Sequence, residues 1–159
     1  GSSWATFVSP VSDELRDVSM ISADDGFIVG VGGRILRWNG SVWTTVSSPV
    51  SVDLYSVHMV SAQSGYAVGA LGTVIYWDGS AWSEIVSPTG ASLNGLSLID
   101  DDTGWAVGDA GTIIRLSNFY KTSGTFLSRI FDGQTVLTTW DVLYWVQGSA
   151  MRFIPLIKT

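Results

Sequence analysis

A 39-residue repeat constrains this chain more than any other feature of its sequence. Trp4, Trp43 and Trp82 recur at that interval, and prolines, leucines, glycines and aromatic residues keep the same register through residue 116. No insertion or deletion interrupts the register. Self-similarity of this length is the signature of solenoids, propellers and other repeat architectures. We therefore expect one structural unit to recur three times.

Each repeat predicts four short β-strands. The first repeat reads, in order, LRDVSMI, FIVG, RILRW and VWTTVS, separated by polar or glycine-bearing turns. Asn39-Gly40 and Asp78-Gly79 lie between the third and fourth strands, where such pairs favour a type I′ hairpin turn. A Ser-Pro pair ends the fourth strand, because proline cannot donate to a β-ladder.

Four antiparallel strands in about 40 residues describe one blade of a β-propeller. The second and third strands are continuously apolar, which suits sheets packed on both faces. A β-solenoid is the alternative, but its coils are usually shorter, and an immunoglobulin-like sandwich would not show three copies in register. The sequence therefore predicts an all-β chain, a partial β-propeller of three four-stranded blades followed by a non-repeat β segment.

The predicted boundaries follow the repeat register. Residues 1–116 hold the blades, with residues 1–9 as the fourth strand of a blade and the remaining strands at 15–49, 54–88 and 93–116. The last blade lacks its own fourth strand, so the N-terminal strand is expected to fill that place and protect the sheet edge. Trp4 and Phe7 are therefore predicted to be assembly residues.

Three blades cannot close a ring, since closed propellers have about four to eight. Three arrangements stay open: the chain is a fragment of a longer protein, several chains combine their blades, or residues 117–159 form the missing sheet. That tail is predicted to be either an additional blade or half of a small sandwich. Phe153 and Ile157, in its apolar last strand, are further assembly residues. Its predicted strands are Thr125–Phe131, Val136–Thr139, Val142–Val146 and Met151–Ile157.

The segment LSLIDDDTGWAVGDAGTII, residues 96–114, resembles the repeats of photosystem II assembly-factor-like propellers, which are akin to bacterial neuraminidase repeats. The shared elements are a Gly-aromatic-Ala-Val-Gly strand, a glycine turn and a branched-chain strand. The family often continues with Thr-Asp-Gly-Gly and a tryptophan, where this chain has RWNGSVW and YWDGSAW. The resemblance covers residues 1–116 and implies a propeller that assists assembly of a membrane complex. In the tail, SGTFLSRIFD and TTWDVLYW resemble small β-sandwich modules of bacterial surface or pilin-like proteins.

Charge and composition argue against several classes of protein. The net charge is −6 and the eight basic residues are scattered, which argues against nucleic acid, since phosphate backbones are bound by lysine and arginine. No run of about 18 apolar residues predicts a transmembrane segment. Without cysteine, disulfides, thiol catalysis and cysteine–zinc sites are excluded. Only 14% of residues are charged, a surface common on extracellular modules, so an extracellular or cell-envelope location is expected.

Candidate catalytic groups are few, and each has a structural explanation. Asp24-Asp25 and Asp100–Asp102 suggest a calcium site or a carboxylate pair, but the middle repeat has Ala62-Gln63-Ser64 there, which favours turn capping. His58 is the sole histidine and has no second histidine for zinc and no Gly-x-Ser-x-Gly motif for a triad. We predict no catalytic residue, no metal site and no cofactor.

Positions that differ between repeats are better ligand-binding candidates than shared positions, which the framework needs. Propellers bind ligands mostly at one mouth of the channel. Arg16, Tyr55 and Asn94 lie beside the proline loop, near the start of the first strand of each repeat, and Asp109 lies in a glycine turn. These four are the predicted ligand-binding residues. The repeat tryptophans, Trp38, Trp43, Trp77, Trp82 and Trp105, are expected to pack within or between blades rather than to stack on sugars.

The function predicted first is a non-enzymatic structural or interaction module of an extracellular or cell-envelope protein. It would assemble with other protein chains by strand complementation, as a homo-oligomer or within a larger parent assembly, such as a surface fibre or pilus with this chain as a pilin-like subunit. Main-chain hydrogen bonds supply the affinity of such strand exchange. The alternatives are a lectin-like, carbohydrate-binding propeller and an assembly chaperone for a membrane protein complex.

Overall fold

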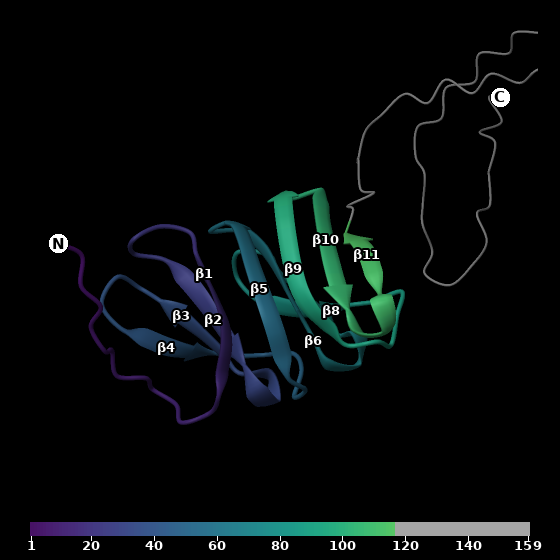
Figure 1. Ribbon diagram of the computed structural model, residues 1–159. Coiled ribbons are helices and arrows are strands. Elements are labelled where there is room, and N and C mark those ends of the chain that lie inside the picture. Colours follow the sequence, from purple (N-terminus) through teal and green to yellow (C-terminus); the bar gives the residue numbers. More distant parts are fainter. Residues whose placement is uncertain (117–159) are drawn as a thin grey trace, which may run out of the picture. The chain divides into compact units, whose positions relative to one another are not determined.

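A computed structural model of the chain describes residues 1–116, which form three antiparallel sheets in chain order (Figure 1). The predicted strands of the repeats are confirmed to within one or two residues. Sheet 1 contains β1 (Leu15–Met20), β2 (Gly26–Gly30), β3 (Ile35–Trp38) and β4 (Trp43–Val46). Sheet 2 contains β5 (Leu54–Ser61), β6 (Ser64–Gly69), β7 (Val74–Trp77) and β8 (Trp82–Ile85). Sheet 3 contains β9 (Leu93–Asp100), β10 (Thr103–Gly108) and β11 (Ile113–Leu116).

Sheet 3 has three strands among the described residues. This agrees with the sequence, because the third repeat lacks the fourth-strand segment of the other two. The strands predicted in 117–159, with Phe153 and Ile157, lie outside the described residues, so the nature of the tail stays a prediction. Among residues 1–116, no helix has the length and apolar character needed to cross a bilayer.

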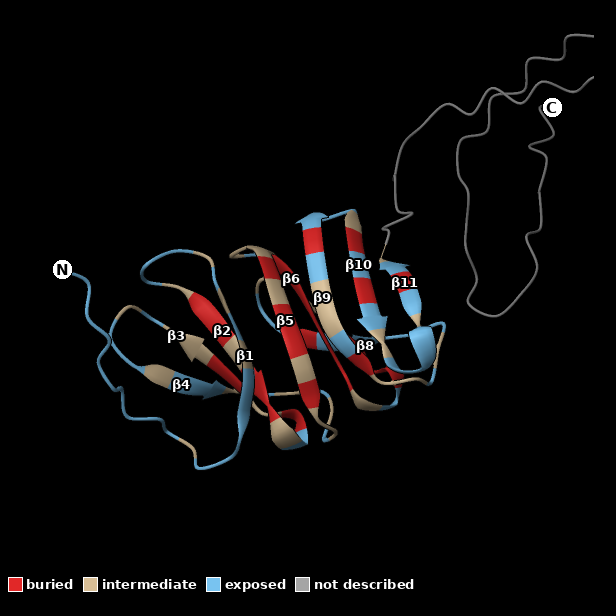
Figure 2. Cartoon of the chain, viewed as in Figure 1, coloured by how far each residue is buried: buried red, intermediate tan, exposed pale blue. Residues whose placement is uncertain are grey.

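The apolar core lies between neighbouring sheets. Each sheet has a forward face, which meets the next sheet in the chain, and a rear face, which meets the preceding one. At the first junction, Phe27, Val29 and Ile35 form the forward face of sheet 1. The rear face of sheet 2 opposite them is formed by Leu54, Val57, Met59, Ala67, Ile75, Trp77 and Trp82. Burial is accordingly concentrated in the strands of sheet 2, β5 and β6 above all (Figure 2).

The second junction repeats the same arrangement one unit later. Tyr66, Val68 and Val74 form the forward face of sheet 2. The rear face of sheet 3 is formed by Leu93, Leu98, Ala106 and Ile114. Burial, followed by electrostatic repulsion from the neighbouring Tyr76 hydroxyl, raises the pKa of the Tyr66 hydroxyl above its usual value. The two junctions therefore use the same repeat positions for the same packing.

Polar contacts add to the first junction. The Asp17 carboxylate on β1 accepts hydrogen bonds from the Ser56 hydroxyl at 2.7 Å and the Val57 backbone N–H at 2.9 Å on β5. The Ser19 hydroxyl accepts another from the Met59 N–H at 3.0 Å. Side chains of β1 thus accept hydrogen bonds from backbone and hydroxyl groups of β5, in addition to the apolar contacts between the two sheets.

The turn between the third and fourth strands differs from the predicted type I′ hairpin. That turn needs a positive φ at both central residues, but here only the glycines, Gly40 and Gly79, have one, at 88° and 95°. The side-chain oxygen of Asn39 instead accepts the N–H groups of residues 41 and 42, and Asp78 does the same for residues 80 and 81. The prediction of a type I′ turn was therefore wrong, because the side-chain cap closes a four-residue loop.

Residues 1–9, predicted to be the fourth strand of a blade, form no strand in this chain. Trp4 is fully exposed and Phe7 is 70% exposed, although the Phe7 ring contacts Trp38 edge-on at 5.5 Å between centroids. No β-ladder pairs the segment with a described strand. Through Phe7, the segment contacts sheet 1, the first sheet in the chain. It was expected to complete the open edge of sheet 3, the last one.

We predict that two aromatic residues at the same repeat position differ sharply in their contribution to stability. Phe27→Ala should lower the free energy of unfolding by about 3–5 kcal/mol, because it leaves a cavity in a fully buried junction. Trp105→Ala should cost less than about 1 kcal/mol, because its side chain is half exposed. Urea unfolding of dilute protein measures both values. Equal losses would contradict the assignment of the core to the junctions.

A second prediction concerns the Asp78 turn. Backbone hydrogen bonds from Ala81 and Ser80 lower the pKa of the exposed Asp78 carboxyl below its ordinary value of 3.8. The carboxylate therefore supports the fold fully above pH 3.8, and that support is lost as the pH falls through the lowered value. Asp78→Asn should keep both hydrogen bonds, as Asn39 does in sheet 1, and lose less stability on acidification. Urea unfolding over the acidic range compares the two, and identical pH profiles would refute this.

Candidate binding surface

A β-bulge lies at the start of the first strand of every sheet, β1, β5 and β9, which we call the inner strands. Leu15 pairs with Gly30 and Asp17 with Val29, which leaves Arg16 as the extra residue of the first bulge. Tyr55 and Asn94 hold the same place in sheets 2 and 3. Bulges redirect a side chain and interrupt pairing, and they recur near functional sites. Three of the four predicted ligand-binding residues therefore occupy one repeated geometry that turns them out of the ladder.

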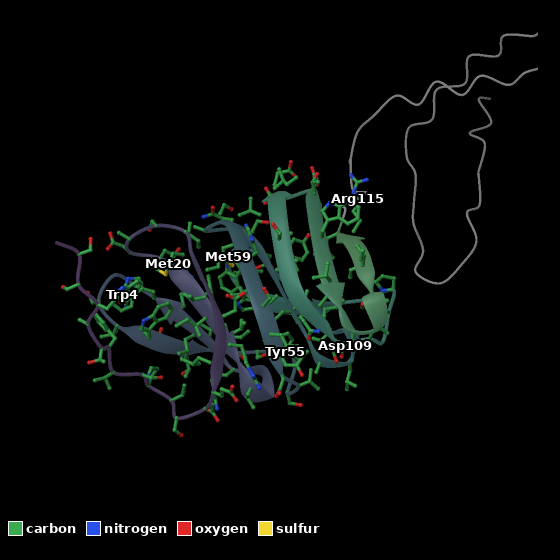
Figure 3. All side chains as sticks on the ribbon, viewed as in Figure 1. Trp4, Met20, Tyr55, Met59, Asp109 and Arg115 are labelled. Carbon is green, nitrogen blue, oxygen red and sulfur yellow. The ribbon has the colours of Figure 1, made fainter. Side chains whose placement is uncertain are left out.

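The fourth predicted residue, Asp109, lies at the same end of the sheets. It begins the 3-10 turn Asp109–Gly111, which follows β10. Tyr55 and Asp109 both lie at the lower end of the ribbon in Figure 3, whereas Met20 and Met59 lie at the upper end. We call this end, formed by the bulges and the 3-10 turns, the rim. The structure thus brings the predicted residues to one rim.

The rim residues form two interacting pairs. The Arg16 guanidinium lies 5.9 Å from the centre of the Tyr55 ring and forms a 3.0 Å ion pair with Glu14. In sheet 3, the Asn94 amide donates a 2.7 Å hydrogen bond to the Asp109 carboxylate. The first pair joins sheets 1 and 2, and the second lies within sheet 3. A ligand at the rim would meet an aromatic–cation pair and an amide–carboxylate pair.

Other polar contacts hold the rim in shape. The Asp53 carboxylate accepts the Gly32 N–H at 2.9 Å from the turn of the preceding sheet. Arg34 forms an ion pair with Asp13 at 2.8 Å. Most rim charges therefore have a partner of opposite sign, and the surface suits a polar ligand that exchanges hydrogen bonds.

The glycines that end the second strands owe their place to crowding. A Cβ at Gly30, Gly69 or Gly108 would collide with the backbone carbonyl oxygen of Glu14, Asp53 or Ser92, which lies just before the inner strand. The next residue donates its N–H to the same oxygen at 2.9 Å in each sheet. This close approach places each 3-10 turn beside the neighbouring bulge, which explains the glycines without a phosphate-binding role. The other two turns are Val31–Gly33 and Ala70–Gly72.

The remaining polar candidates are dispersed. His58 lies in the middle of β5 opposite Tyr66, away from the rim. Asp25 binds Arg37 through two 3.0 Å hydrogen bonds, which raise the pKa of Arg37, and Asp100 caps its own turn by accepting the Asp102 N–H. Within residues 1–116, no three of the His, Asp and Glu side chains are grouped as a metal site would require.

Sequence reasoning missed one surface. Trp105 was expected to pack within or between blades, but it is 49% exposed on the forward face of sheet 3, and its neighbours Val107 and Ile113 are 49% and 67% exposed. The repeat register gave no signal of this exposure, because the same positions in sheets 1 and 2 fill junctions. Trp77 and Trp82, by contrast, are buried as expected.

Comparison with known proteins gives a likeness in structure alone. No protein-family model and no curated protein matches the sequence. Two solved structures of YCF48, a photosystem II assembly factor with a β-propeller fold, are similar in structure to this chain. The first is YCF48 bound to D1 peptide, with a TM-score of 0.60 and 21% identity over 69% of this chain. The second is YCF48 from Cyanidioschyzon merolae, with a TM-score of 0.61 and 18% identity over 72% of this chain.

The three sheets are β-propeller blades. This confirms the predicted fold class and the resemblance on which it was based. The chain spans 39% and 41% of the length of these two YCF48 chains, so it corresponds to part of such a propeller. At 21% and 18% identity this likeness shows the fold alone, and it lends no support to the surface-fibre or pilin-like function predicted first. The extracellular location, strand complementation, glycan binding and homo-oligomer stay predictions.

We predict that the glycine ending β6 cannot be replaced. Gly69→Ala should lower the free energy of unfolding by about 1–3 kcal/mol, because the new methyl group must push the Asp53 carbonyl away. Gly90→Ala is the control, since a Cβ at that position meets no atom within 4 Å. Denaturant unfolding compares the two variants. Equal tolerance of both changes would rule out crowding as the origin of the rim geometry.

Proposed function

We propose that this chain is a non-enzymatic, protein-binding part of a β-propeller that assists assembly of a membrane protein complex by holding a peptide segment of a client protein. The observation that carries the proposal is the fold likeness to an assembly factor whose structure includes a bound peptide. The described blades add a rim at which three bulges present different side chains, Arg16, Tyr55 and Asn94, in one geometry.

The rim side chains suit a peptide ligand. Tyr55 offers an aromatic ring of low conformational entropy, the kind of residue that dominates binding energy at protein interfaces. Asn94 and Asp109 offer an amide and a carboxylate, which can exchange hydrogen bonds with peptide N–H and C=O groups. The Arg16 guanidinium beside Tyr55 can bind a client carboxylate or carbonyl. An extended peptide would meet these groups in turn as it crosses from blade to blade.

The charge of the blades indicates which peptides bind first. Residues 1–116 hold twelve acidic and four basic side chains. A field of this sign speeds encounters with neutral or basic segments and slows those with acidic ones. We therefore expect client segments that carry lysine or arginine near an apolar or aromatic anchor.

Peptide binding to the full chain tests the proposal. Fluorescence anisotropy would be measured with a labelled D1 peptide and with basic, neutral and acidic peptides from other membrane proteins. We expect basic or neutral peptides to bind, and Tyr55→Ala to weaken that binding about tenfold or more. Gln63→Ala, an exposed change at the opposite end of the same blade, is the control and should bind as the wild type does. Binding that ignores Tyr55, or none to any peptide, would overturn the proposal.

A further inference from the structure

The forward face of the third blade exposes residues that the other blades bury. Trp105, Val107 and Ile113 are 49%, 49% and 67% exposed. Their counterparts in the first two blades are at most 9% exposed. These counterparts are Phe27, Val29 and Ile35 in the first blade and Tyr66, Val68 and Val74 in the second. The third blade therefore presents a face built for a blade-to-blade junction, without a neighbouring blade among the described residues.

The rear face of the first blade is open in part, along β1, whereas Leu36 on the same face is fully buried. Leu15, Val18 and Met20 are 36%, 53% and 48% exposed, whereas Leu54, Val57 and Met59 of the second blade are at most 7% exposed. Figure 2 shows β1 mostly in the colours of exposed and intermediate residues, in contrast to β5. Within residues 1–116, therefore, one face of each kind lacks a neighbouring blade.

The first junction shows what each open face binds. The Phe27 ring packs on the rings of Trp77 and Trp82, at 5.1 and 5.5 Å between centroids. Arg37 lies over Phe27 and Trp77, at 5.2 and 5.5 Å from their centres. One forward-face aromatic and one arginine therefore contact a pair of tryptophans on the rear face.

Both halves of this contact recur on the open faces. The third blade carries Trp105 and Arg115 at the repeat positions of Phe27 and Arg37. The first blade carries Trp38 and Trp43 as a pair at 5.4 Å, close to the 5.7 Å of the buried tryptophan pair. The Trp38 indole N–H donates to the Ala23 carbonyl at 3.0 Å, as Trp77 does to Ala62. The open tryptophan pair is therefore already arranged as the buried one is.

In this chain, Phe7 occupies part of that position. Its ring meets Trp38 at 5.5 Å and 88°, whereas Phe27 meets Trp77, the repeat counterpart of Trp38, at 5.1 Å and 56°. The contact is shallow, because Phe7 remains 70% exposed and its segment forms no strand. Phe7 is thus a partial substitute for the aromatic residue of a preceding blade.

We propose that the forward face of the third blade binds the rear face of the first blade of a second copy, and that Trp105 of one copy displaces Phe7 of the other from Trp38. Faces at the same repeat positions pack on each other at both junctions of this structure, which is why each open face suits the other. The contact joins two different surfaces, so it is head-to-tail and either closes a ring or extends a chain of copies. It lies between blades rather than at the rim and is independent of the proposed peptide binding.

The mass of the full chain in solution tests this proposal. Sedimentation velocity over a range of concentrations should show self-association of the wild type. Trp105→Asp and Val18→Asp should each abolish it, because a charge would be buried in an apolar junction. Val86→Asp places the same charge on an exposed valine that belongs to neither face and should associate as the wild type does. Phe7→Ala should strengthen association about threefold to tenfold, since no competing aromatic contact must be broken.

Mixing the two blocked variants gives the sharpest result. Trp105→Asp retains a working rear face and Val18→Asp a working forward face, so the mixture should form a 1:1 dimer that neither variant forms alone. A wild type that stays monomeric, or a mixture that does, overturns the proposal. A monomeric wild type whose equilibrium constant of unfolding rises several-fold on Trp105→Asp would overturn it in a specific way. Residues 117–159 of the same chain would then cover the face in place of a second copy. Circular dichroism confirms that each variant is folded.

Discussion

The packing of one two-faced sheet against the next is the interaction on which the described structure depends. At both junctions a forward face of aromatic and β-branched side chains meets an apolar rear face. That rear face includes methionine and tryptophan at the first junction, and leucine, alanine and isoleucine at the second. The Asp17 carboxylate adds hydrogen bonds to the first junction. Repeat proteins gain their stability from such nearest-neighbour interfaces, because a single unit cannot bury its own apolar faces. The outermost faces of a short array are therefore left to other partners.

The same packing creates the rim. Inner strands of neighbouring blades lie close together, and each begins with a bulge whose extra residue leaves the ladder. The crowded contact at Gly69 holds the 3-10 turn against that bulge. The framework thus fixes the direction of a side chain whose identity it does not restrict. Arginine, tyrosine and asparagine can follow one another at this position because no core contact depends on them.

Much of this was available from the sequence, because a fixed 39-residue register with period-specific turns leaves few folds. The strands, the blade architecture and the rim residues followed from that register. The side-chain caps at Asn39 and Asp78 did not, since an Asn-Gly pair is compatible with more than one turn. The exposure of Trp105 also did not follow, because a repeat position reports what a residue is suited to contact and not whether the partner is present.

The N-terminal segment shows the same limit. Its tryptophan and proline keep the register of a fourth strand, but strand formation depends on a neighbouring edge that supplies backbone hydrogen bonds. Here the segment instead places Phe7 on Trp38, where an apolar ring gains contact without a ladder. Sequence pattern identified the residues that need a partner, and the three-dimensional arrangement decides which partner they find.

A double-mutant cycle on Phe27 and Trp77 tests the central claim most directly, since their rings meet at 5.1 Å across the first junction. The free energy of unfolding would be measured by urea titration for the wild type, Phe27→Leu, Trp77→Leu and the double variant. Junction packing of the kind described predicts a coupling free energy of about 0.5–1.5 kcal/mol between the two positions. Losses that add to within about 0.3 kcal/mol would contradict it.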